Sequence, residues 1–509
     1  MTDQAFGTLT DIISLHDELT PNACALSCDG ESVTWGELHD RVGRVAHALT
    51  CLDIAPGDKV ASLGAPSIAH VVGLLGALRA GACIVPLPTS ATGPALDGML
   101  DDCGAKAIMV DAESRALLGS FEDRLRTNKI ALDFSSSNWL QLGDMISGAT
   151  PDLPLARIVP EDDFNIIYSS GTTGVPKGIV HSHDTRMRQA LRRSFDLSRA
   201  SALLLATPLY SNTTLMPMFA AMVHGAQTIL MRKFDAARYL AIAAAQRVTH
   251  TMLVPVQYWR LLALPDFDQH DLSHFKLKQS TGAPLDAALK RELSERWPGR
   301  MIDVFGMTEG GTTCILDIGA HPDKLHTVGQ PAPAHDIRLI DEEGRVLPPG
   351  ATGEVVGRGP FMMTRYHNKP SLTEEIRWRD EYGQIFHRSG DVGRFDADGF
   401  LVLLDRKKDV IISGGSNIYA SDLEAVLSQH PDVADVAVIG VPSEAWGETP
   451  LGLVARRPGG NVEAAALREW ANAQLGKTQR LSAIEFRDAL PRSSLGKLLK
   501  RELRAPYWK

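Results

Sequence analysis

The stretch Tyr168-Ser169-Ser170-Gly171-Thr172-Thr173-Gly174-Val175-Pro176-Lys177-Gly178 gives the clearest indication of what this chain folds into and does. It follows an apolar, strand-like run at residues 164–167 and combines three glycines, four Ser or Thr hydroxyls and one lysine. Glycine lets backbone N–H groups approach an anion, hydroxyls donate further hydrogen bonds, and lysine supplies positive charge. The stretch therefore suits a loop that wraps around phosphates, although a flexible turn has a similar composition.

The spacing of this loop differs from that of a Walker P-loop, in which the lysine is followed by Ser or Thr. In this chain Lys177 is followed by Gly178. The phosphate interpretation therefore depends on five further motifs downstream. They are Thr281-Gly282-Ala283-Pro284-Leu285, Val304-Phe305-Gly306-Met307-Thr308-Glu309, His387-Arg388-Ser389-Gly390-Asp391-Val392, Asp405-Arg406-Lys407-Lys408-Asp409 and Leu490-Pro491-Arg492-Ser493-Ser494-Leu495-Gly496-Lys497.

In this order and spacing, the motifs resemble those of the adenylate-forming superfamily, which comprises acyl-CoA synthetases, peptide-synthetase adenylation domains and luciferases. The resemblance extends over nearly the whole chain and is greatest to the acyl- and aryl-CoA ligases. It implies an enzyme that uses ATP and Mg²⁺ to turn a carboxylic acid into its acyl-AMP. The acyl group would then pass to coenzyme A, the co-substrate, and pyrophosphate and AMP would be released.

By this resemblance, the glycine-rich loop and four downstream motifs form the ATP site. The hydroxyls of the loop and Lys177 would hold the β- and γ-phosphates. Phe305, where the family usually has Tyr, would lie on the adenine. Asp391 would accept hydrogen bonds from both ribose hydroxyls, and Arg406 would donate to the same sugar. The expected ATP-binding residues are Ser169, Ser170, Gly171, Thr172, Thr173, Gly174, Lys177, Gly282, Ala283, Pro284, Phe305, Gly306, Met307, Asp391 and Arg406.

Thr308, Glu309 and Lys497 are the expected catalytic residues. The carboxylate of the acid must attack the α-phosphorus of ATP, so the site has to neutralise two anions and the departing pyrophosphate. The resemblance places Thr308 at the α-phosphate and Glu309 on the metal ion. Lys497, a flexible cation, would reach both the attacking carboxylate and the α-phosphate.

The second half-reaction needs a different arrangement, because the lysine must leave before a thiol can reach the acyl carbonyl. The family rotates its small C-terminal domain for this purpose, and Lys408 matches the hinge. Gly414, Gly415 and Trp446 would then lie at the coenzyme A, although packing between domains explains Trp446 equally well. Asp405 stands where a glycine is usual, which can alter the hinge geometry but removes no ligand.

The expected acyl pocket consists of Tyr210, Ser211, Asn212, Gly310 and Gly311. A neutral Asn cannot pair with a substrate ammonium, so an α-amino acid is disfavoured. Asn212 resembles the Asn with which aryl-acid adenylating enzymes bind a ring hydroxyl, and the two glycines would leave room for a ring or an extended chain. An aromatic or cyclic acid is therefore favoured over acetate or a long fatty acid. The structural alternative is that Asn212 caps its own backbone.

The hydrophobic pattern predicts an α/β fold. Capping-box spacing at residues 34–37 predicts a helix over residues 35–49, and a further helix is expected over residues 216–223. Strands alternate with helices over residues 59–110 and again over residues 202–254, which predicts two layered α/β sheets.

At 509 residues the chain is too long for one hydrophobic core. Short strands with turn signals from residue 336 predict a β-rich lobe, and the charged run at residues 405–409 predicts a hinge. We expect a large N-terminal domain of residues 1–404, with two layered sheets plus the β-rich lobe. A small mobile α+β domain of residues 405–509 would follow.

The composition excludes several other classes of protein. Lys and Arg number 52 against 61 Asp and Glu, so the formal charge of −9 gives no overall attraction to nucleic acid or to a membrane surface. The six cysteines lack the spacing of a metal site, and no secretory or membrane-spanning run is found, so a cytoplasmic protein is expected. The expected partners are a small-molecule carboxylic acid and coenzyme A, and homodimers are common in the family.

Four alternatives share part of this pattern. A stand-alone adenylation enzyme would load a carrier protein, and because no carrier domain follows Lys509, transfer within the chain is not expected. A medium-chain fatty acyl-CoA synthetase differs only in the acid, and a luciferase-type monooxygenase shares the first step. A nucleotide-binding regulator would have lost Lys497, Glu309 or Asp391, and all three are present.

Overall fold

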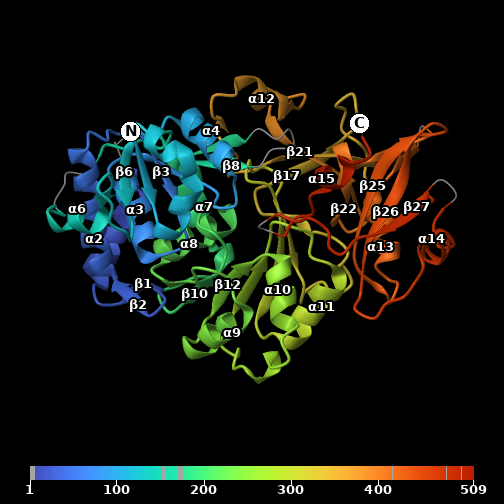
Figure 1. Cartoon of the computed structure of the whole chain (residues 1–509), viewed down its shortest axis with the longest axis horizontal. Coiled ribbons are helices and arrows are strands. Elements are labelled where there is room, and N and C mark those ends of the chain that lie inside the picture. Colours follow the sequence, from blue (N-terminus) through green and yellow to red (C-terminus); the bar gives the residue numbers. More distant parts are fainter. Residues whose placement is uncertain are drawn as a thin grey trace.

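A computed structural model describes residues 6–151, 156–169, 176–414, 416–476, 479–493 and 496–508. Two large α/β sheets form the N-terminal part, a smaller antiparallel sheet follows, and a compact unit with its own sheet ends the chain (Figure 1). This arrangement confirms the predicted fold class.

The first sheet has the strand order β19-β9-β8-β4-β3-β5-β6-β7. Strands β3 to β8 are parallel to their neighbours within the sheet, whereas β9 and β19 at one edge are antiparallel. The strands are β3 (Lys59–Leu63), β4 (Cys83–Pro86), β5 (Ala107–Val110), β6 (Asn128–Ala131), β7 (Leu140–Gln141), β8 (Asp163–Ser169), β9 (Lys177–Ser182) and β19 (Arg365–Tyr366). The helices along this part are α3 (Ile68–Arg79), α4 (Gly93–Cys103), α5 (Ala112–Arg115), α6 (Leu142–Ser147) and α7 (His183–Ala190).

The second sheet has the order β16-β15-β14-β13-β12-β10-β11-β1-β2, with a parallel centre and antiparallel strands at both edges. Its strands are β1 (Cys24–Cys28), β2 (Glu31–Thr34), β10 (Ala202–Leu205), β11 (Gln227–Leu230), β12 (His250–Leu253), β13 (Leu277–Ser280), β14 (Arg300–Phe305), β15 (Cys314–Asp317) and β16 (Gln330–Pro331). The associated helices are α1 (Leu9–Leu19), α2 (Trp35–Cys51), α8 (Asn212–His224), α9 (Ala236–Ala245), α10 (Pro255–Leu262) and α11 (Ala287–Arg296). The predicted second layered sheet is thus present.

Two smaller sheets follow in the chain. The β-rich lobe contains β17 (Asp336–Ile340), β18 (Thr352–Arg358), β20 (Arg377–Arg379), β21 (Ile385–Phe395) and β22 (Leu401–Arg406), with helix α12 (Pro370–Glu375) beside it. The C-terminal unit contains β23 (Ile411–Ser413), β24 (Ser416–Ile418), β25 (Val433–Ser443), β26 (Gly447–Arg456) and β27 (Ala483–Phe486), with helices α13 (Ala420–Leu427), α14 (Ala464–Asn472) and α15 (Lys500–Arg504).

Helix α2 begins at the predicted capping box. The Thr34 hydroxyl accepts a hydrogen bond from the Glu37 N–H (3.2 Å), and the Glu37 carboxylate accepts one from the Thr34 N–H (2.8 Å). The two bonds satisfy N–H groups that the helix itself leaves without a partner. The helix then runs two residues beyond the predicted end, to Cys51.

Helix α8 begins four residues before the predicted start. The prediction missed the first turn because its residues are polar and resemble a loop. The Ser211 hydroxyl accepts a hydrogen bond from the Thr213 N–H (3.2 Å) and caps the helix. Asn212 is therefore the first helical residue. The N-terminal turn of this otherwise apolar helix is therefore polar.

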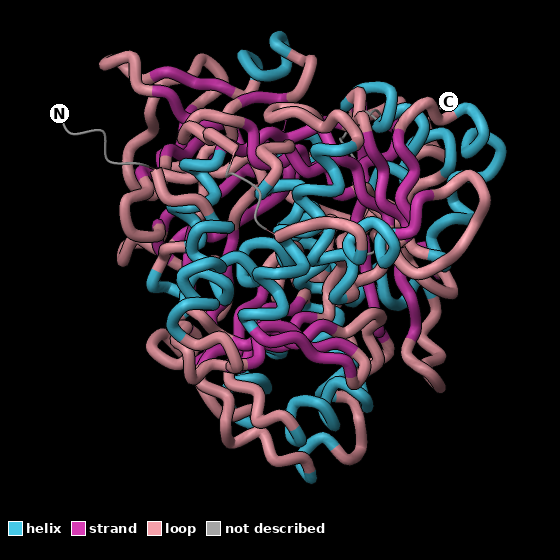
Figure 2. The backbone as a smooth tube through the Cα atoms, turned by 90° about the vertical axis from the view of Figure 1, so that its left-hand side faces the viewer, coloured by secondary structure: helices cyan, strands magenta, loops and turns pink. Residues whose placement is uncertain are grey.

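Helix α8 lies between the two large sheets. Phe219 of α8 meets Phe164 of β8, from the first sheet, with ring centroids 5.2 Å apart, while other residues of α8 contact β10 and β12 of the second sheet. A side view shows helices between two groups of strands (Figure 2). One apolar core therefore fixes the two sheets relative to each other.

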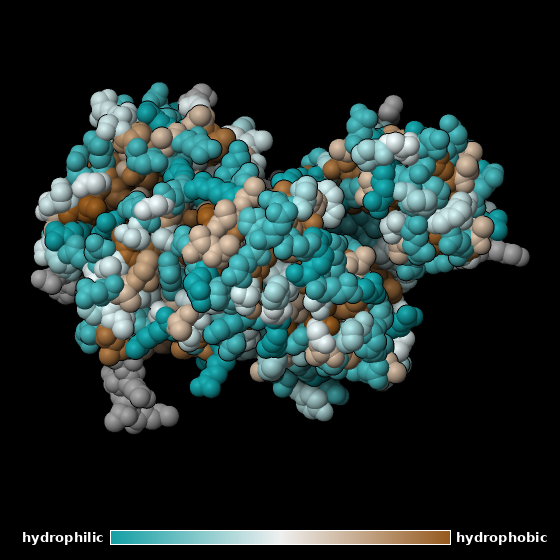
Figure 3. Space-filling model, turned by 90° about the horizontal axis from the view of Figure 1, so that it is seen from below, coloured by the Kyte–Doolittle hydropathy of each residue, from teal (hydrophilic) through white to brown (hydrophobic). Residues whose placement is uncertain are grey.

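The chain passes from the β-rich lobe to the C-terminal unit between Arg406, the last residue of β22, and Ile411, the first of β23. Our predicted domain boundary at residues 404 and 405 falls inside β22. Contacts bridge the junction, because the Asp405 carboxylate accepts a hydrogen bond from the Ala420 N–H at the start of α13 (2.8 Å). A notch separates the smaller C-terminal body from the rest of the surface (Figure 3).

Among the described residues, no helix is long and apolar enough to cross a lipid bilayer. All six cysteines are unpaired, and Cys28, Cys83, Cys103 and Cys314 are buried. Burial raises the pKa of the Cys28 thiol to about 11, so this thiol stays protonated at neutral pH. Cys24 is partly exposed and Cys51 is exposed.

Candidate active site

The predicted phosphate loop connects two antiparallel strands. Ser169, at the end of β8, pairs with Lys177, the first residue of β9. Residues 170–175 lie outside the described residues, so the predicted roles of Ser170, Gly171, Thr172, Thr173 and Gly174 stay predictions. The Lys177 ammonium lies 5.5 Å from the centre of the Tyr366 ring, which comes from the adjacent strand β19.

Thr308 and Glu309 lie in the loop between β14 and β15, and three elements hold this loop. The Met363 N–H donates to the Glu309 carbonyl (2.8 Å), and so does His387 Nδ1 (3.1 Å). His181 Nε2 lies 2.9 Å from the Thr308 carbonyl. Backbone contacts of this number give both side chains a defined position.

The Glu309 carboxylate is oriented by Tyr366. The Tyr366 hydroxyl donates to Glu309 Oε1 (2.6 Å), and burial together with the charge of Glu309 raises the pKa of this phenol. With Oε1 held, Oε2 remains as a hard oxygen ligand. Mg²⁺ is usually bound by one or two carboxylates and by substrate phosphates, so this donor fits the ion that the family implies. Within the described part of the chain, no group of three or more His, Cys, Asp or Glu side chains is placed to hold a metal ion.

The predicted adenine site lies at the ends of β13 and β14. Phe305 is partly exposed, and the rest of its side chain packs against the buried cluster that includes Cys314 and Leu401. Gly282 has φ +90°, and the position of a Cβ there would lie 3.9 Å from the Thr213 hydroxyl of α8. This left-handed backbone conformation favours glycine. Gly282 thus lies beside the helix of the predicted acyl pocket.

Asp391 of β21 and Arg406 of β22 form an ion pair with Nε and Oδ1 2.7 Å apart. Burial raises the pKa of Asp391, while the charges of Arg406 and Lys497 oppose the rise. Desolvation lowers the pKa of Lys497, Arg406 lowers it further, and Asp391 raises it. The predicted ribose pair and the predicted catalytic lysine are therefore close enough to act on one another electrostatically.

The loop that carries Lys497 contacts the N-terminal part. A Cβ on Gly496 would lie only 2.9 Å from Val256 of α10. The loop is shaped by a bond from the Lys497 N–H to the Ser493 hydroxyl (3.1 Å) and by one from the Ser493 N–H to the Lys497 carbonyl (2.8 Å). In the described conformation this loop therefore lies against α10, and Lys497 is close enough to Asp391 and Arg406 for their charges to act on its pKa.

In the predicted acyl pocket, the structural alternative for Asn212 does not apply. The cap of α8 is the Ser211 hydroxyl, and Asn212 Oδ1 instead accepts a hydrogen bond from the Arg186 guanidinium (2.8 Å). Asn212 and Tyr210 are both partly exposed, and the Tyr210 hydroxyl lies 3.3 Å from that of Ser90.

Gly310 and Gly311 are glycines for a reason other than the predicted one. Both have positive φ, of +73° and +98°. A Cβ on Gly310 would lie 2.2 Å from the Phe361 carbonyl oxygen, and one on Gly311 would lie 2.4 Å from that of Gly357. The space of the missing side chains is already filled by backbone, so the expected room for a ring does not arise from these side-chain positions. Their backbone remains a candidate wall of the pocket.

The predicted coenzyme A residues gather on the C-terminal unit. Trp446 is 61% exposed, and its carbonyl accepts a hydrogen bond from the Gly414 N–H (2.9 Å). This exposure argues against the alternative that Trp446 packs between domains. Gly415 lies outside the described residues. Lys408 lies in the short 3₁₀ turn Lys407–Asp409, at the predicted hinge.

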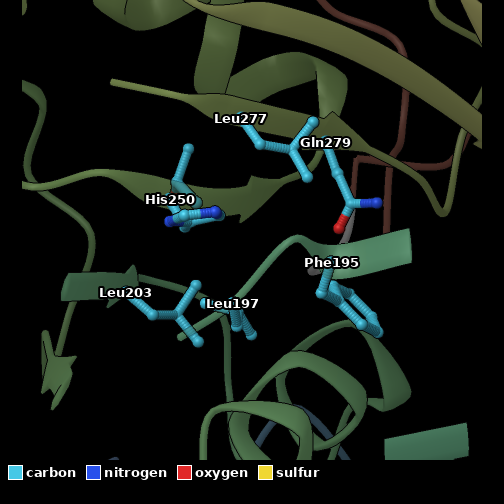
Figure 4. Close-up of a pocket in the computed structure, with 7 residues that line it drawn as sticks. Phe195, Leu197, Leu203, His250, Leu277 and Gln279 are labelled. Carbon is cyan, nitrogen blue, oxygen red and sulfur yellow. The ribbon is translucent and has the colours of Figure 1, made fainter. Parts of the chain in front are cut away.

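A small cavity lies against the second sheet, away from the predicted ATP residues. Its walls come from the beginnings of β12 and β13 and from the segment before β10 (Figure 4). Burial lowers the pKa of His250 to about 4. The predicted site lies at the opposite, carboxyl ends of these strands. The cavity is therefore not part of it.

The sequence analysis missed four residues of the site. Tyr366, His181, Arg186 and His387 bind the backbone or side chains of predicted residues, although none of them was assigned a role. His387 stands in one of the quoted motifs, so its position was a usable signal. For the other three, no local pattern indicated that their strands and helix would face the site.

Comparison with known proteins agrees with this geometry. The family described as AMP-binding enzyme matches residues 15–367, and that described as AMP-binding enzyme C-terminal domain matches residues 422–497. The chain belongs to this family of adenylate-forming enzymes, which confirms the family inferred from the motifs. It has the family's large N-terminal and small C-terminal parts.

Individual relatives cover nearly the whole chain. A feruloyl-CoA synthase from Amycolatopsis sp is 34% identical over 96% of this chain and 97% of its own length. A fatty acid–[acyl-carrier-protein] ligase, ScoC, from Streptomyces coeruleorubidus is 31% identical over 98% and 96%. The crystal structure of the anthranilate CoA ligase AuaEII with anthranoyl-AMP superposes with a TM-score of 0.88 at 26% identity, over 99% and 97% of the two chains. The predicted class, an AMP-forming acid–thiol ligase, is thereby confirmed.

Proposed function

We propose that the protein activates an aromatic or cyclic carboxylic acid with ATP and transfers the acyl group to free coenzyme A. The observation that carries the first half-reaction is the placement of Lys497. Its loop contacts α10, and its charge acts on the Asp391–Arg406 pair. A cation there neutralises the charge that builds up as two anions approach each other.

In the first step, a carboxylate oxygen bonds to the α-phosphorus, and the bond from this phosphorus to the pyrophosphate oxygen breaks. Thr308 would hold the α-phosphate and Glu309 would hold Mg²⁺, which supplies positive charge against the phosphates. Asp391 and Arg406 would position the ribose. Tyr366 and His387 would act indirectly by fixing the Glu309 side chain and backbone.

In the second step, the sulfur of the thiol bonds to the acyl carbon, AMP leaves with the bonding electron pair, and the thiol proton is released. Gly414 and Trp446 lie together on the C-terminal unit and would reach the site after rotation about Lys408. Lys497 belongs to the same C-terminal unit and is influenced by the charges of Asp391 and Arg406 in the described conformation. We therefore assign residues of this unit to both steps, with a rotation of the unit between them.

Two features support an aromatic acid and free coenzyme A. The relative from Amycolatopsis sp is named a feruloyl-CoA synthase, and AuaEII holds anthranoyl-AMP. Asn212 is partly exposed beside the adenine loop and is neutral, which suits an acid without an α-ammonium. A carrier protein is the second candidate acceptor, because ScoC is named for that reaction.

The test is pyrophosphate release with ATP, Mg²⁺ and a panel of benzoic, cinnamic, cyclic and straight-chain acids, each with and without coenzyme A. We expect one aromatic or cyclic acid to turn over repeatedly only when coenzyme A is present, and its acyl-CoA to be found by mass spectrometry. An acid that forms acyl-AMP without discharge by coenzyme A would make the carrier protein the acceptor. No pyrophosphate release with any acid would contradict the proposal.

A further inference from the structure

Arg186 of α7 is a buried cation at the centre of a hydrogen-bonded network. It is 1% exposed, and its guanidinium donates from Nε to Asn165 Oδ1 (2.6 Å) and from NH1 to both Gln189 Oε1 (2.7 Å) and Asn212 Oδ1 (2.8 Å). NH2 lies 3.3 Å from His181 Nδ1. In the part of the chain that the structure describes, no Asp or Glu forms an ion pair with Arg186.

A guanidinium has five N–H donors and no acceptor, so it decides the direction of every bond in this network. The Asn212 atom that meets Arg186 must be the amide oxygen, which removes the usual uncertainty about how an Asn side chain is turned. The group that Asn212 offers to a ligand is therefore its Nδ2 amide, a donor. Asn212 is partly exposed, and the next residue, Thr213, lies beside Gly282 of the predicted adenine loop.

The same logic fixes His181. Its Nδ1 faces two donors, Arg186 NH2 and Asn165 Nδ2, both at 3.3 Å, so Nδ1 must be the unprotonated acceptor. The proton then lies on Nε2, which donates to the Thr308 carbonyl (2.9 Å). Burial and the charge of Arg186 lower the pKa of His181 well below its usual range, which agrees with a neutral ring. The network thus connects the acyl pocket with the Thr308 backbone.

We propose that Arg186 is a positioning residue that makes Asn212 an obligate hydrogen-bond donor in an electropositive acyl pocket. The enzyme would then select acids with a hydrogen-bond acceptor on the ring or chain, such as a hydroxyl, carbonyl or second carboxylate oxygen. An uncompensated positive charge 2.8 Å behind the amide favours an anionic acceptor most and an ammonium least. This inference rests on the proposed function and narrows its substrate class.

The test compares matched acids that differ in one substituent at each ring position: hydrogen, methyl, hydroxyl, carboxylate and aminomethyl. At one position we expect the wild type to prefer hydroxyl or carboxylate over methyl by at least about tenfold in kcat/KM for pyrophosphate release, because a site built to hydrogen-bond rejects analogues without the partner. Asn212→Leu should reduce this ratio to within about twofold. Asn212→Asp, which pairs with Arg186 but cannot donate, should lose the carboxylate preference and gain turnover of the aminomethyl acid.

Arg186→Met should reduce the same ratio by releasing the Asn212 amide, and Arg186→Lys should retain part of the preference for the carboxylate. If Arg186→Met does not fold, the two Asn212 variants carry the test. Gln189→Met is the matched control. It removes the hydrogen bond from Arg186 NH1 to Gln189 and leaves the one from Arg186 NH1 to Asn212 in place. It should keep the wild-type ratio.

Equal kcat/KM for methyl and hydroxyl acids at every position, or an unchanged ratio in Asn212→Leu, would overturn the inference. Either result leaves the ligase proposal intact, provided that the thioester still forms. If coenzyme A fails to discharge the acyl-AMP, only the proposal that coenzyme A is the acyl acceptor is refuted. The preference for the acid's substituent can still be measured by pyrophosphate release. No pyrophosphate release with any acid would refute both.

Discussion

At the scale of single residues, Lys497 combines an exposed side chain with two charged neighbours. Partial desolvation and the charge of Arg406 lower the pKa of Lys497, and the charge of Asp391 opposes this change. We propose that the ammonium group of Lys497 neutralises the two anions that the adenylation step brings together.

Replacing Lys497 by Ala should reduce acyl-AMP formation by about 10²–10³-fold, the usual cost of losing one group that stabilises a developing charge. Thioester formation from supplied acyl-AMP should change little, because Lys497 must have moved away from the acyl carbonyl before the thiol attacks. Both rates can be measured separately, by pyrophosphate release and by free thiol consumption. Lys276→Ala is the control, since Lys276 is an exposed lysine that immediately precedes β13. Equal losses in both steps would remove the proposed role.

Tyr366 provides a second test at this scale. Tyr366→Phe removes the hydrogen bond to Glu309 Oε1 and leaves the carboxylate free to turn. Partners of metal ligands typically contribute 10–100-fold in affinity, so the Mg²⁺ concentration for half-maximal adenylation should rise by about tenfold or more. The rate at saturating Mg²⁺ should fall less. Tyr382→Phe, at a 78% exposed position, is the control, and an unchanged Mg²⁺ dependence would contradict the prediction.

At the scale of elements, the junction between β22 and α13 holds the C-terminal unit in the described orientation. Asp405 accepts hydrogen bonds from the Arg406 N–H (2.7 Å) and from the Ala420 N–H (2.8 Å), and the Ser421 hydroxyl donates to the Leu404 carbonyl. Asp405 and Leu404 come before Lys408, whereas Ala420 and Ser421 come after it. Rotation about Lys408 would therefore have to break the two bonds made by Ala420 and Ser421.

The hinge prediction belongs to this junction. Lys408 lies in a 3₁₀ turn, whose backbone angles proline can adopt, so Lys408→Pro should stiffen the hinge without unfolding it. Adenylation should remain within about threefold of the wild type, whereas thioester formation should fall by at least about tenfold, since only the second step needs rotation. Lys408→Ala is the control for the lost charge. Normal thioester formation in Lys408→Pro would rule out rotation at this residue.

Several elements were predictable because their signals are local. The capping box at Thr34 fixed the start of α2, and the apolar run of β3 gave its bounds (Lys59–Leu63). The start of α8 was wrong by four residues, because a polar first turn capped by Ser211 looks like a loop until its packing is known. The reason given for Gly310 and Gly311 was wrong too, since only the fold shows the backbone against them.

At the scale of the whole molecule, buried neutral histidines couple stability to pH. Burial lowers the pKa of His183, His250 and His387 to about 4 each. Between pH 6.5 and 4 the unfolded chain binds more protons at these residues than the folded chain does. The free energy of unfolding should therefore fall as the pH is lowered through this window.

We expect the Tm to fall by at least about 5 °C between pH 6.5 and 5, which differential scanning calorimetry can measure. His250→Asn should make the slope of Tm against pH shallower, because it removes one of the groups that must bind a proton on unfolding. His250 is chosen because it lies at the small cavity, away from the ATP residues. A wild-type Tm that is constant over this range would contradict the prediction.

The class of enzyme and the α/β fold could be predicted from the sequence alone, and its motifs supplied the candidate site residues. The chemistry requires certain residue types: glycines and hydroxyls for phosphates, a carboxylate for a metal ion and a lysine near the end of the chain. The order of these residues can be recognised in the sequence without knowledge of the fold. Only the tertiary structure showed the hydrogen bonds from Tyr366 to Glu309, from His181 to Thr308 and from Arg186 to Asn212. These contacts join strands and helices far apart in sequence, and which side chains meet depends on the packing of two sheets around α8. The direction of a hydrogen bond can be assigned only when both of its partners are known.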